Sequence, residues 1–173
     1  MKKEQKKAEL GRSMNYIEKV EEFAKKNLTG YSLKHTKLVV KLALELCENY
    51  ADADIEIVAI SAWLHDISHT DEDHHIKSSR IADKLLTKLG MDKKEEILHC
   101  ILSHRTGRMP VPFTIEAEIV FSADNLSHFV DFQGLVKLRN FEWAYAKIQK
   151  DLKSGMLPEA KEKAEKIFKE IKR

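Results

Sequence analysis

Apolar residues recur along most of the chain at the three- and four-residue spacing of amphipathic helices. No stretch of useful length alternates apolar and polar residues with the period of two that a half-buried strand requires. The sequence also contains no internal repeat. The pattern therefore predicts an all-α protein built as one bundle of about six to eight helices.

Capping residues and helix breakers set the expected ends of these helices. Ser13 and Ser32 are good N-caps, Gly90 stops a helix, and Asp92 with Glu95 forms a capping box. The predicted helices cover residues 13–28, 32–50, 54–64, a segment ending at 89, 92–104, 114 to beyond 124, about 133–150, and 159–172. The segment 54–64 is apolar around most of its circumference, so we expect it at the centre of the core.

The length of 173 residues suits one domain with an ample core. Residues 1–12 are rich in lysine and lack apolar periodicity, and we expect them to form a flexible basic arm. Residues 13–155 are predicted to form the domain itself. The segment 156–173 is predicted to contribute a C-terminal amphipathic helix that packs on this domain.

Composition and charge narrow the classes of function. Hydrophobic residues make up 43% and charged residues 34% of the chain, which is typical of a soluble globular protein. With 30 Lys and Arg against 28 Asp and Glu, the net charge is only +2, so we expect no nucleic-acid polymer as a partner.

Cys47 and Cys100 fall within apolar helical patterns and are expected to be buried free thiols. The absence of a membrane-spanning run and of an apolar signal core predicts a cytoplasmic protein with no membrane partner.

Adjacent histidine and aspartate follow the most apolar segment and need a physical explanation. Burial of an unpaired charge or an unsatisfied imidazole costs several kcal/mol, so His65 and Asp66 require either partners or solvent. A hydrogen-bonded pair or a solvent-facing helix end would satisfy them. Other polar residues also lie beside apolar core positions, namely His35, His74, His75, His99, His104 and Asp124. Imidazole and carboxylate together suit divalent Fe, Mn, Co, Ni or Zn, so converging helix ends could equally form a metal site.

These residues stand in motifs of a recognisable order. His35 is followed by Ala-Ile-Ser-Ala-Trp-Leu-His-Asp-Ile at 59–67, Asp-His-His-Ile-Lys-Ser-Ser-Arg-Ile-Ala at 73–82, His-Cys-Ile-Leu-Ser-His-Arg at 99–105 and Ser-Ala-Asp at 122–124. Over about residues 31–140 the sequence resembles the HD superfamily of metal-dependent phosphohydrolases. The resemblance implies a single HD-domain helical bundle with a metal site at its centre.

The resemblance also implies a set of ligands. The implied ligands of one ion are His35, His65, Asp66 and Asp124. Members with two ions add two histidines, which fall here on His74 and His104, and the Asp of the His-Asp pair, Asp66, bridges both ions. His75 competes with His74, but the family spacing to the small residues that follow favours His74. The expected cofactor is one or two divalent ions per chain, with Fe, Mn, Co, Ni, Zn and Mg left open.

The other histidines receive no ligand assignment. His99 lies about 500° around a helix from His104, so the two cannot easily share one ion and His99 is expected to be structural. His69 follows the His-Asp pair and is expected either to support the ligands or to face a substrate. His128 is expected on the outer part of its helix.

The activity implied by the resemblance is hydrolysis by metal-activated water. A divalent ion lowers the pKa of a bound water and polarises a phosphoryl oxygen, which suits an ester or anhydride of a small phosphorylated molecule such as a nucleotide. Asp66 is the predicted catalytic residue. Arg105, Lys137 and Arg139 are candidate cations for the phosphoryl oxygens of this substrate. A proton for the leaving group could come from residues 71–73 or from a histidine outside the ligand set.

Two other classes of function stay open. A set of four His and two Asp also resembles the mixed-valent di-iron oxygenases built on the same bundle, and the bundle could instead be a non-catalytic module that senses a nucleotide. Alarmone hydrolases of the superfamily carry Glu-Asp where His69 and Thr70 stand, which disfavours that activity. Ser122 and Ser127 replace acidic residues of several cytoplasmic relatives, which weakens a substrate analogy with them. The oligomeric state, including a homo-oligomer, is left open.

Overall fold

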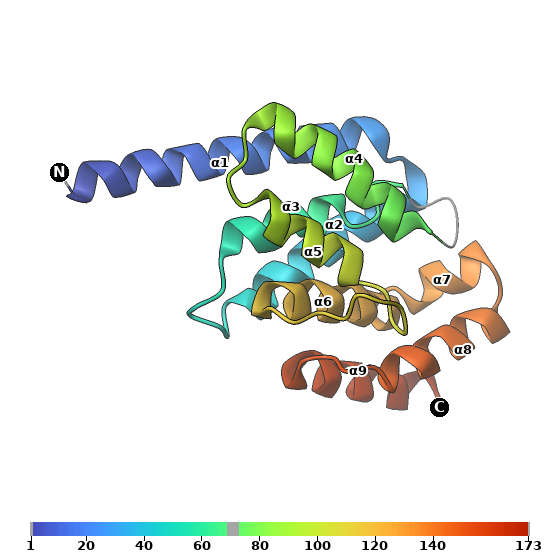
Figure 1. The fold of residues 1–173 in the computed structure, drawn as a ribbon. Helices are drawn as coiled ribbons and strands as arrows, with labels where there is room; N and C mark the ends of the chain where they lie inside the picture. The colour runs from blue at the N-terminus through green and yellow to red at the C-terminus, as the bar shows by residue number, and fades with distance from the viewer. Residues whose placement is uncertain (1, 69–72, 173) are drawn as a thin grey trace.

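The computed structural model describes residues 2–68 and 73–172, with side chains from residue 14 onward. Within these residues all regular secondary structure is helical (Figure 1). The nine helices described are α1 Lys2–Asn27, α2 Gly30–Cys47, α3 Ile55–Leu64, α4 His74–Leu89, α5 Lys94–Ser103, α6 Ile115–Val130, α7 Phe132–Leu138, α8 Phe141–Leu152 and α9 Pro158–Ile171. The all-α prediction is confirmed, and the number of helices lies just above the predicted range.

The helix α3 occupies the centre of the bundle. Every residue from Glu56 to Leu64 is buried, and the helix packs against α1, α2, α5 and α6. Burial on all sides explains why this segment has no polar face in its sequence. Because α3 ends at Leu64, the following His65 and Asp66 lie inside the bundle, and His65 is fully buried.

The helix α6 crosses the same centre and is buried without interruption from Ile119 to Phe129. It packs most extensively against α2 on one side and α9 on another. The contact with α9 is made by one apolar stripe on that helix, formed by Ala160, Ala164 and Phe168. The C-terminal helix therefore covers the helix that carries Asp124.

Two predicted boundaries are wrong. The first helix already begins at Lys2 rather than at Ser13, and its blue N-terminal part extends past the rest of the bundle in Figure 1. Lys, Glu, Gln and Ala are strong helix formers, so these residues can be helical without an apolar face. The helix predicted for 133–150 is divided into α7 and α8, because Asn140 is extended and its side chain caps α8 by accepting from Trp143 N at 2.8 Å.

Two further expectations can be compared with the structure. Cys47 and Cys100 are buried free thiols, as predicted, and burial raises the pKa of Cys100 to about 12. In the part of the chain that the structure describes, no helix combines the length and the apolar character needed to cross a bilayer.

Asp54 fixes the start of the central helix. Its Oδ1 accepts hydrogen bonds from Glu56 N at 3.0 Å and Ile57 N at 3.3 Å, and its Oδ2 accepts from Lys93 Nζ at 2.7 Å. Burial alone would raise the pKa of Asp54, but Lys93 and the two backbone N–H groups lower it overall. Asp54 therefore stabilises the native state in its ionised form.

We expect Asp54→Ala to lower the free energy of unfolding by about 1–2 kcal/mol, because both the cap and the ion pair are lost. Asp54→Asn keeps a capping oxygen and should cost less. Since the native pKa is depressed, the difference between wild type and Asp54→Asn should be full above pH about 4 and shrink as the pH falls further. Urea unfolding at several pH values measures both effects, with Asn140→Ala as a cap variant on the remote α8. A pH-independent difference would contradict the assigned ion pair.

Candidate metal centre

Five parts of the bundle bring the predicted ligands together. They are His35 on α2, His65 and Asp66 directly after α3, His74 at the start of α4, His104 directly after α5, and Asp124 on α6. Four of these side chains are buried, whereas Asp66 and His74 keep 18% and 20% of their side-chain surface exposed. The centre is thus deep in the core but accessible from the side of Asp66 and His74.

Local hydrogen bonds orient the buried imidazoles. Nδ1 of His65 lies 2.8 Å from Ala62 O, and Nδ1 of His104 lies 2.7 Å from Ile101 O. A carbonyl oxygen can only accept, so each Nδ1 donates to it. A neutral ring in this tautomer presents its Nε2 lone pair to the centre, as metal-binding histidines do.

The ring of His35 is oriented through a serine. Ser127 Oγ lies 2.7 Å from Asp124 O, to which its hydroxyl donates, and 3.3 Å from His35 Nδ1. The hydroxyl oxygen can therefore accept from Nδ1 of His35. Ser127 thus helps to turn Nε2 of His35 toward Asp124.

The first ligand set consists of His35, His65, Asp66 and Asp124. Nε2 of His35 lies 3.2 Å from Asp124 Oδ1, 3.3 Å from His65 Nε2 and 3.8 Å from Asp66 Oδ2. Nε2 of His65 lies 3.8 Å from each of the same two carboxylate oxygens. Two atoms that bind one ion at about 2.1 Å are about 3.0–4.2 Å apart for angles between about 90° and 180°. These five separations fit ligands of a single divalent ion, and the donor atoms of His35, His65 and Asp66 all lie within 4.8 Å of one another.

The second ligand set uses the other oxygen of Asp66. Its Oδ1 lies 3.2 Å from His74 Nε2 and 3.4 Å from His104 Nε2. This buried oxygen makes no hydrogen bond of acceptable geometry, although two imidazole nitrogens face it. A cation between the three atoms would satisfy it, so these residues also fit a divalent ion. Among the side chains that the structure describes, His75 belongs to no such cluster, which favours His74 as the ligand.

The charges of the centre are set by burial and by the neighbouring rings. Burial, together with His104 and His35, lowers the pKa of His65 to about 4 despite the nearby carboxylates, so this ring is neutral at neutral pH. Burial would raise the pKa of Asp66 and Asp124, but the surrounding imidazoles hold both carboxyls well below their usual range. Asp66 and Asp124 therefore offer ionised oxygens and His65 a neutral nitrogen, which are the forms that bind a cation.

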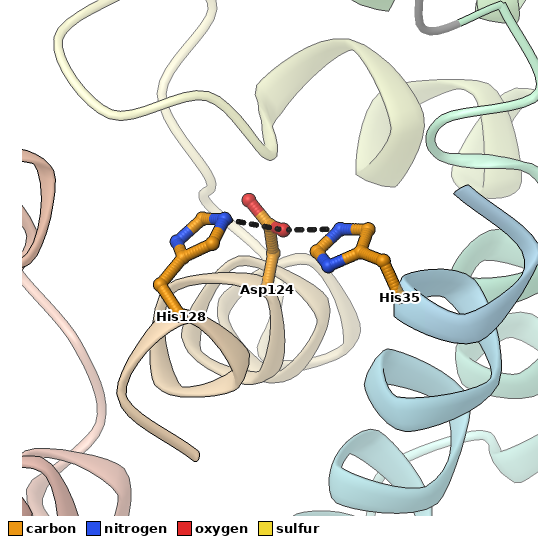
Figure 2. A group of neighbouring side chains, drawn as sticks. All are labelled: His35, Asp124 and His128. Carbon is orange, nitrogen blue, oxygen red and sulfur yellow. Dashed lines mark ion pairs between the residues drawn. The ribbon is translucent and has the colours of Figure 1, made fainter. Parts of the chain in front are cut away.

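His128 is the residue that the sequence interpretation missed. It is buried rather than on the outer part of its helix, and its ring stacks on that of His35 with the centroids 5.6 Å apart. Its Nε2 lies 3.9 Å from Asp124 Oδ1, and Figure 2 shows the two rings on opposite sides of that carboxylate. The available signal was the four-residue spacing from Asp124, which puts both side chains on one face of α6.

His99 and Asp73 belong to neither ligand set. His99 accepts a hydrogen bond from Phe113 N at 3.3 Å and packs against the Phe113 ring, in keeping with a structural role. Asp73 is exposed immediately before α4. His69, Asp71 and Glu72 lie outside the described residues.

A cavity of about 460 Å³ is lined in part by the loop that follows His104 in the sequence. Arg105, which follows the candidate ligand His104, lines it together with Arg108 and Lys153. Glu118 contributes a carboxylate to the same lining. Three cations against one carboxylate make this cavity suited to an anionic molecule.

The other two candidate substrate cations lie elsewhere. Lys137 and Arg139 are exposed at the end of α7 and are not part of the lining of this cavity. The guanidinium carbon of Arg139 lies 5.4 Å from the centre of the Trp143 ring. A role for these two residues in substrate binding stays a prediction.

The bundle thus gathers imidazoles and carboxylates into groups that could hold divalent ions, which is the arrangement of an all-α protein with a central metal site. The family model of the HD domain matches residues 32–128, more than half of the chain, and the chain therefore belongs to the HD domain family. The match contains all the candidate ligands, from His35 to Asp124, and ends at His128.

A solved structure has the same fold. The crystal structure of an HD-superfamily hydrolase from Bacillus thuringiensis aligns with a TM-score of 0.66 and 20% sequence identity. The alignment covers 92% of this chain and 94% of the other. No curated protein matches the sequence.

We expect the protein purified without chelator to carry about two divalent ions per chain, falling to about one in His74→Ala/His104→Ala, because only the second ligand set is removed. Elemental mass spectrometry measures this content. His99→Ala, which removes a histidine outside the two sets, should keep the wild-type content. Equal metal content in wild type and double variant would contradict the second set.

Proposed function

We propose that the protein is a metal-dependent phosphohydrolase that hydrolyses a phosphate ester or anhydride of a small molecule such as a nucleotide. The observation that carries this proposal is the division of the Asp66 carboxylate between two ligand sets, with Oδ2 toward His35 and His65 and Oδ1 toward His74 and His104. A shared carboxylate of this kind suits a pair of ions acting on one phosphoryl group.

The proposed division of labour follows from the donor atoms. His35, His65, Asp66 and Asp124, linked by the separations given above, would hold one ion. Asp66, His74 and His104 would hold the other. Divalent ions bound there lower the pKa of a water molecule and polarise a phosphoryl oxygen. Asp66 would contribute to holding both ions, and the backbone bonds of His65 and His104 limit rotation of these two rings. The reacting groups are thus held in one orientation before reaction.

The substrate is proposed to occupy the cationic cavity after His104. Arg105, Arg108 and Lys153 can balance the charge of phosphate groups, and Arg offers paired donors that match phosphate oxygens. Thr106 Oγ1 donates to Asn125 Oδ1 at 2.7 Å, which ties this loop to α6 one residue after Asp124. The volume of about 460 Å³ falls within the range of small-molecule sites. The Bacillus thuringiensis protein of the same fold is named as a hydrolase, which supports the proposal by analogy.

A di-iron oxygenase is the second candidate function. It is favoured by one observation, namely that four of the six candidate ligands are imidazoles, a nitrogen-rich set that suits iron. Iron at both positions together with substrate-dependent consumption of dioxygen would distinguish this function from hydrolysis.

The proposal predicts release of inorganic phosphate from at least one member of a panel of sugar phosphates, nucleoside monophosphates and nucleoside di- and triphosphates. The assay uses metal-loaded protein, with Mn²⁺, Co²⁺, Fe²⁺ and Mg²⁺ tested separately. Chelation or Asp66→Asn should reduce the rate to background, because the substitution removes one of the two Asp66 oxygens and the negative charge that both ligand sets use. Metal-loaded wild type that releases no phosphate from any member, but consumes dioxygen, would replace hydrolysis by the oxygenase.

We expect Arg105→Ala to lower kcat/KM by about 10- to 100-fold, the effect of losing one charged hydrogen bond to phosphate. The bound metal content should stay unchanged, because Arg105 belongs to neither ligand set. Lys161 lies on the exposed face of α9, so Lys161→Ala is the control variant that removes a positive charge away from the cavity and should leave kcat/KM unchanged. An unchanged kcat/KM would remove Arg105 from the substrate site.

A further inference from the structure

His128 is held by a buried pair of charges that the proposed chemistry does not use. Asp151 on α8 is fully buried, and its Oδ2 lies 2.9 Å from His128 Nδ1. Lys147, one turn earlier on α8, donates to both carboxylate oxygens at 2.7 Å. A buried carboxylate needs such compensation, and here an ammonium and an imidazole N–H together provide it.

The hydrogen bonds define which nitrogen of His128 is available. Nδ1 of His128 lies 2.9 Å from Asp151 Oδ2 and 3.1 Å from Lys147 Nζ. Because the ammonium already donates to both Asp151 oxygens and an ionised carboxylate only accepts, we assign the ring proton to Nδ1, which donates it to Asp151. A neutral ring then carries its lone pair on Nε2. Histidines that bind metal ions are oriented in this way, with the second ring nitrogen donating to a carboxylate.

The free nitrogen faces the metal centre. Nε2 of His128 lies 3.9 Å from Asp124 Oδ1, which is too long for a hydrogen bond but within the separation of two ligands on one ion. Nε2 of His35 lies 3.2 Å from the same oxygen. The three donor atoms lie within 4.8 Å of one another, and Figure 2 shows both rings directed at the Asp124 carboxylate.

We propose that His128 is a further protein ligand of the ion held by His35 and Asp124, and that Asp151 and Lys147 position it. This inference rests on the proposed metal-dependent function, but His128 is absent from the ligand set that the family resemblance implies. The HD family match ends at His128, so the two positioning residues on α8 lie beyond the matched region. With this imidazole the first ion would have five protein ligands, three of them nitrogens, whereas the second ion would have three, two of them nitrogens.

The test is a Co²⁺ titration of metal-free protein, followed by visible absorption and by calorimetry. Co²⁺ serves as the probe because its absorption depends on the number and type of its ligands. His128→Ala should weaken binding of one Co²⁺ by more than about 10-fold and change its absorption spectrum. Asp151→Asn should weaken it by about 10- to 100-fold, the usual effect of removing a residue that orients a ligand.

Three controls keep the result specific. His99→Ala removes a histidine outside the centre and should leave both affinities and the spectrum unchanged. Circular dichroism of each metal-free variant checks the fold, and His128→Gln replaces His128→Ala if alanine proves unstable. Free imidazole added to His128→Ala should restore part of the spectrum if the ring acts as a ligand, whereas a purely structural loss would not respond.

The outcomes separate the inference from the function on which it rests. Wild type that binds no Co²⁺ would overturn both. Wild type that binds Co²⁺ while folded His128→Ala or His128→Gln shows the same affinity and spectrum would overturn only the assignment of His128, which would then act as a polar neighbour of Asp124. Weakened binding with an altered spectrum in the His128 variants, rescued by imidazole, supports the assignment.

Discussion

The core of this bundle has to accommodate ionised carboxylates. Asp66 and Asp124 lie among apolar helices, where an uncompensated charge would cost several kcal/mol. Imidazoles from α2, α4 and α6 and from the ends of α3 and α5 supply the compensation, so all of these elements have to approach one small volume. The helix α3 is therefore buried on every side, and α3 and α5 both end beside the two carboxylates.

The inner helices could be predicted from the sequence because a buried helix face requires apolar residues at every third or fourth position. The prediction failed where helix formation does not depend on burial. Residues 2–12 are helical through the intrinsic preference of Lys, Glu, Gln and Ala, which produces no apolar period. Between 133 and 150 the apolar repeat continues across Asn140, but one side-chain bond to the backbone of Trp143 is enough to end one helix and begin another.

The order of the candidate ligands could also be predicted, but their convergence could not, because it depends on how separate helices cross. The choice of His74 over His75 illustrates the limit: neighbours on a helix point about 100° apart, so only one of them can face Asp66. His128 was missed for a similar reason. The residues that turn its ring toward Asp124 are Lys147 and Asp151, which come from another helix later in the chain.

His35 and Asp124 lie far apart in sequence yet 3.2 Å apart in space. An ion held by both would act as a cross-link that closes a loop of roughly 90 residues. Closing such a loop costs the chain a large amount of conformational entropy. The unfolded chain cannot offer this arrangement, so the ion would bind only the folded protein. Its binding free energy would then add to the free energy of unfolding, which would rise with the concentration of free metal. When little metal is available, α2 and α6 would separate more often, and the opened chain would be exposed to proteolysis.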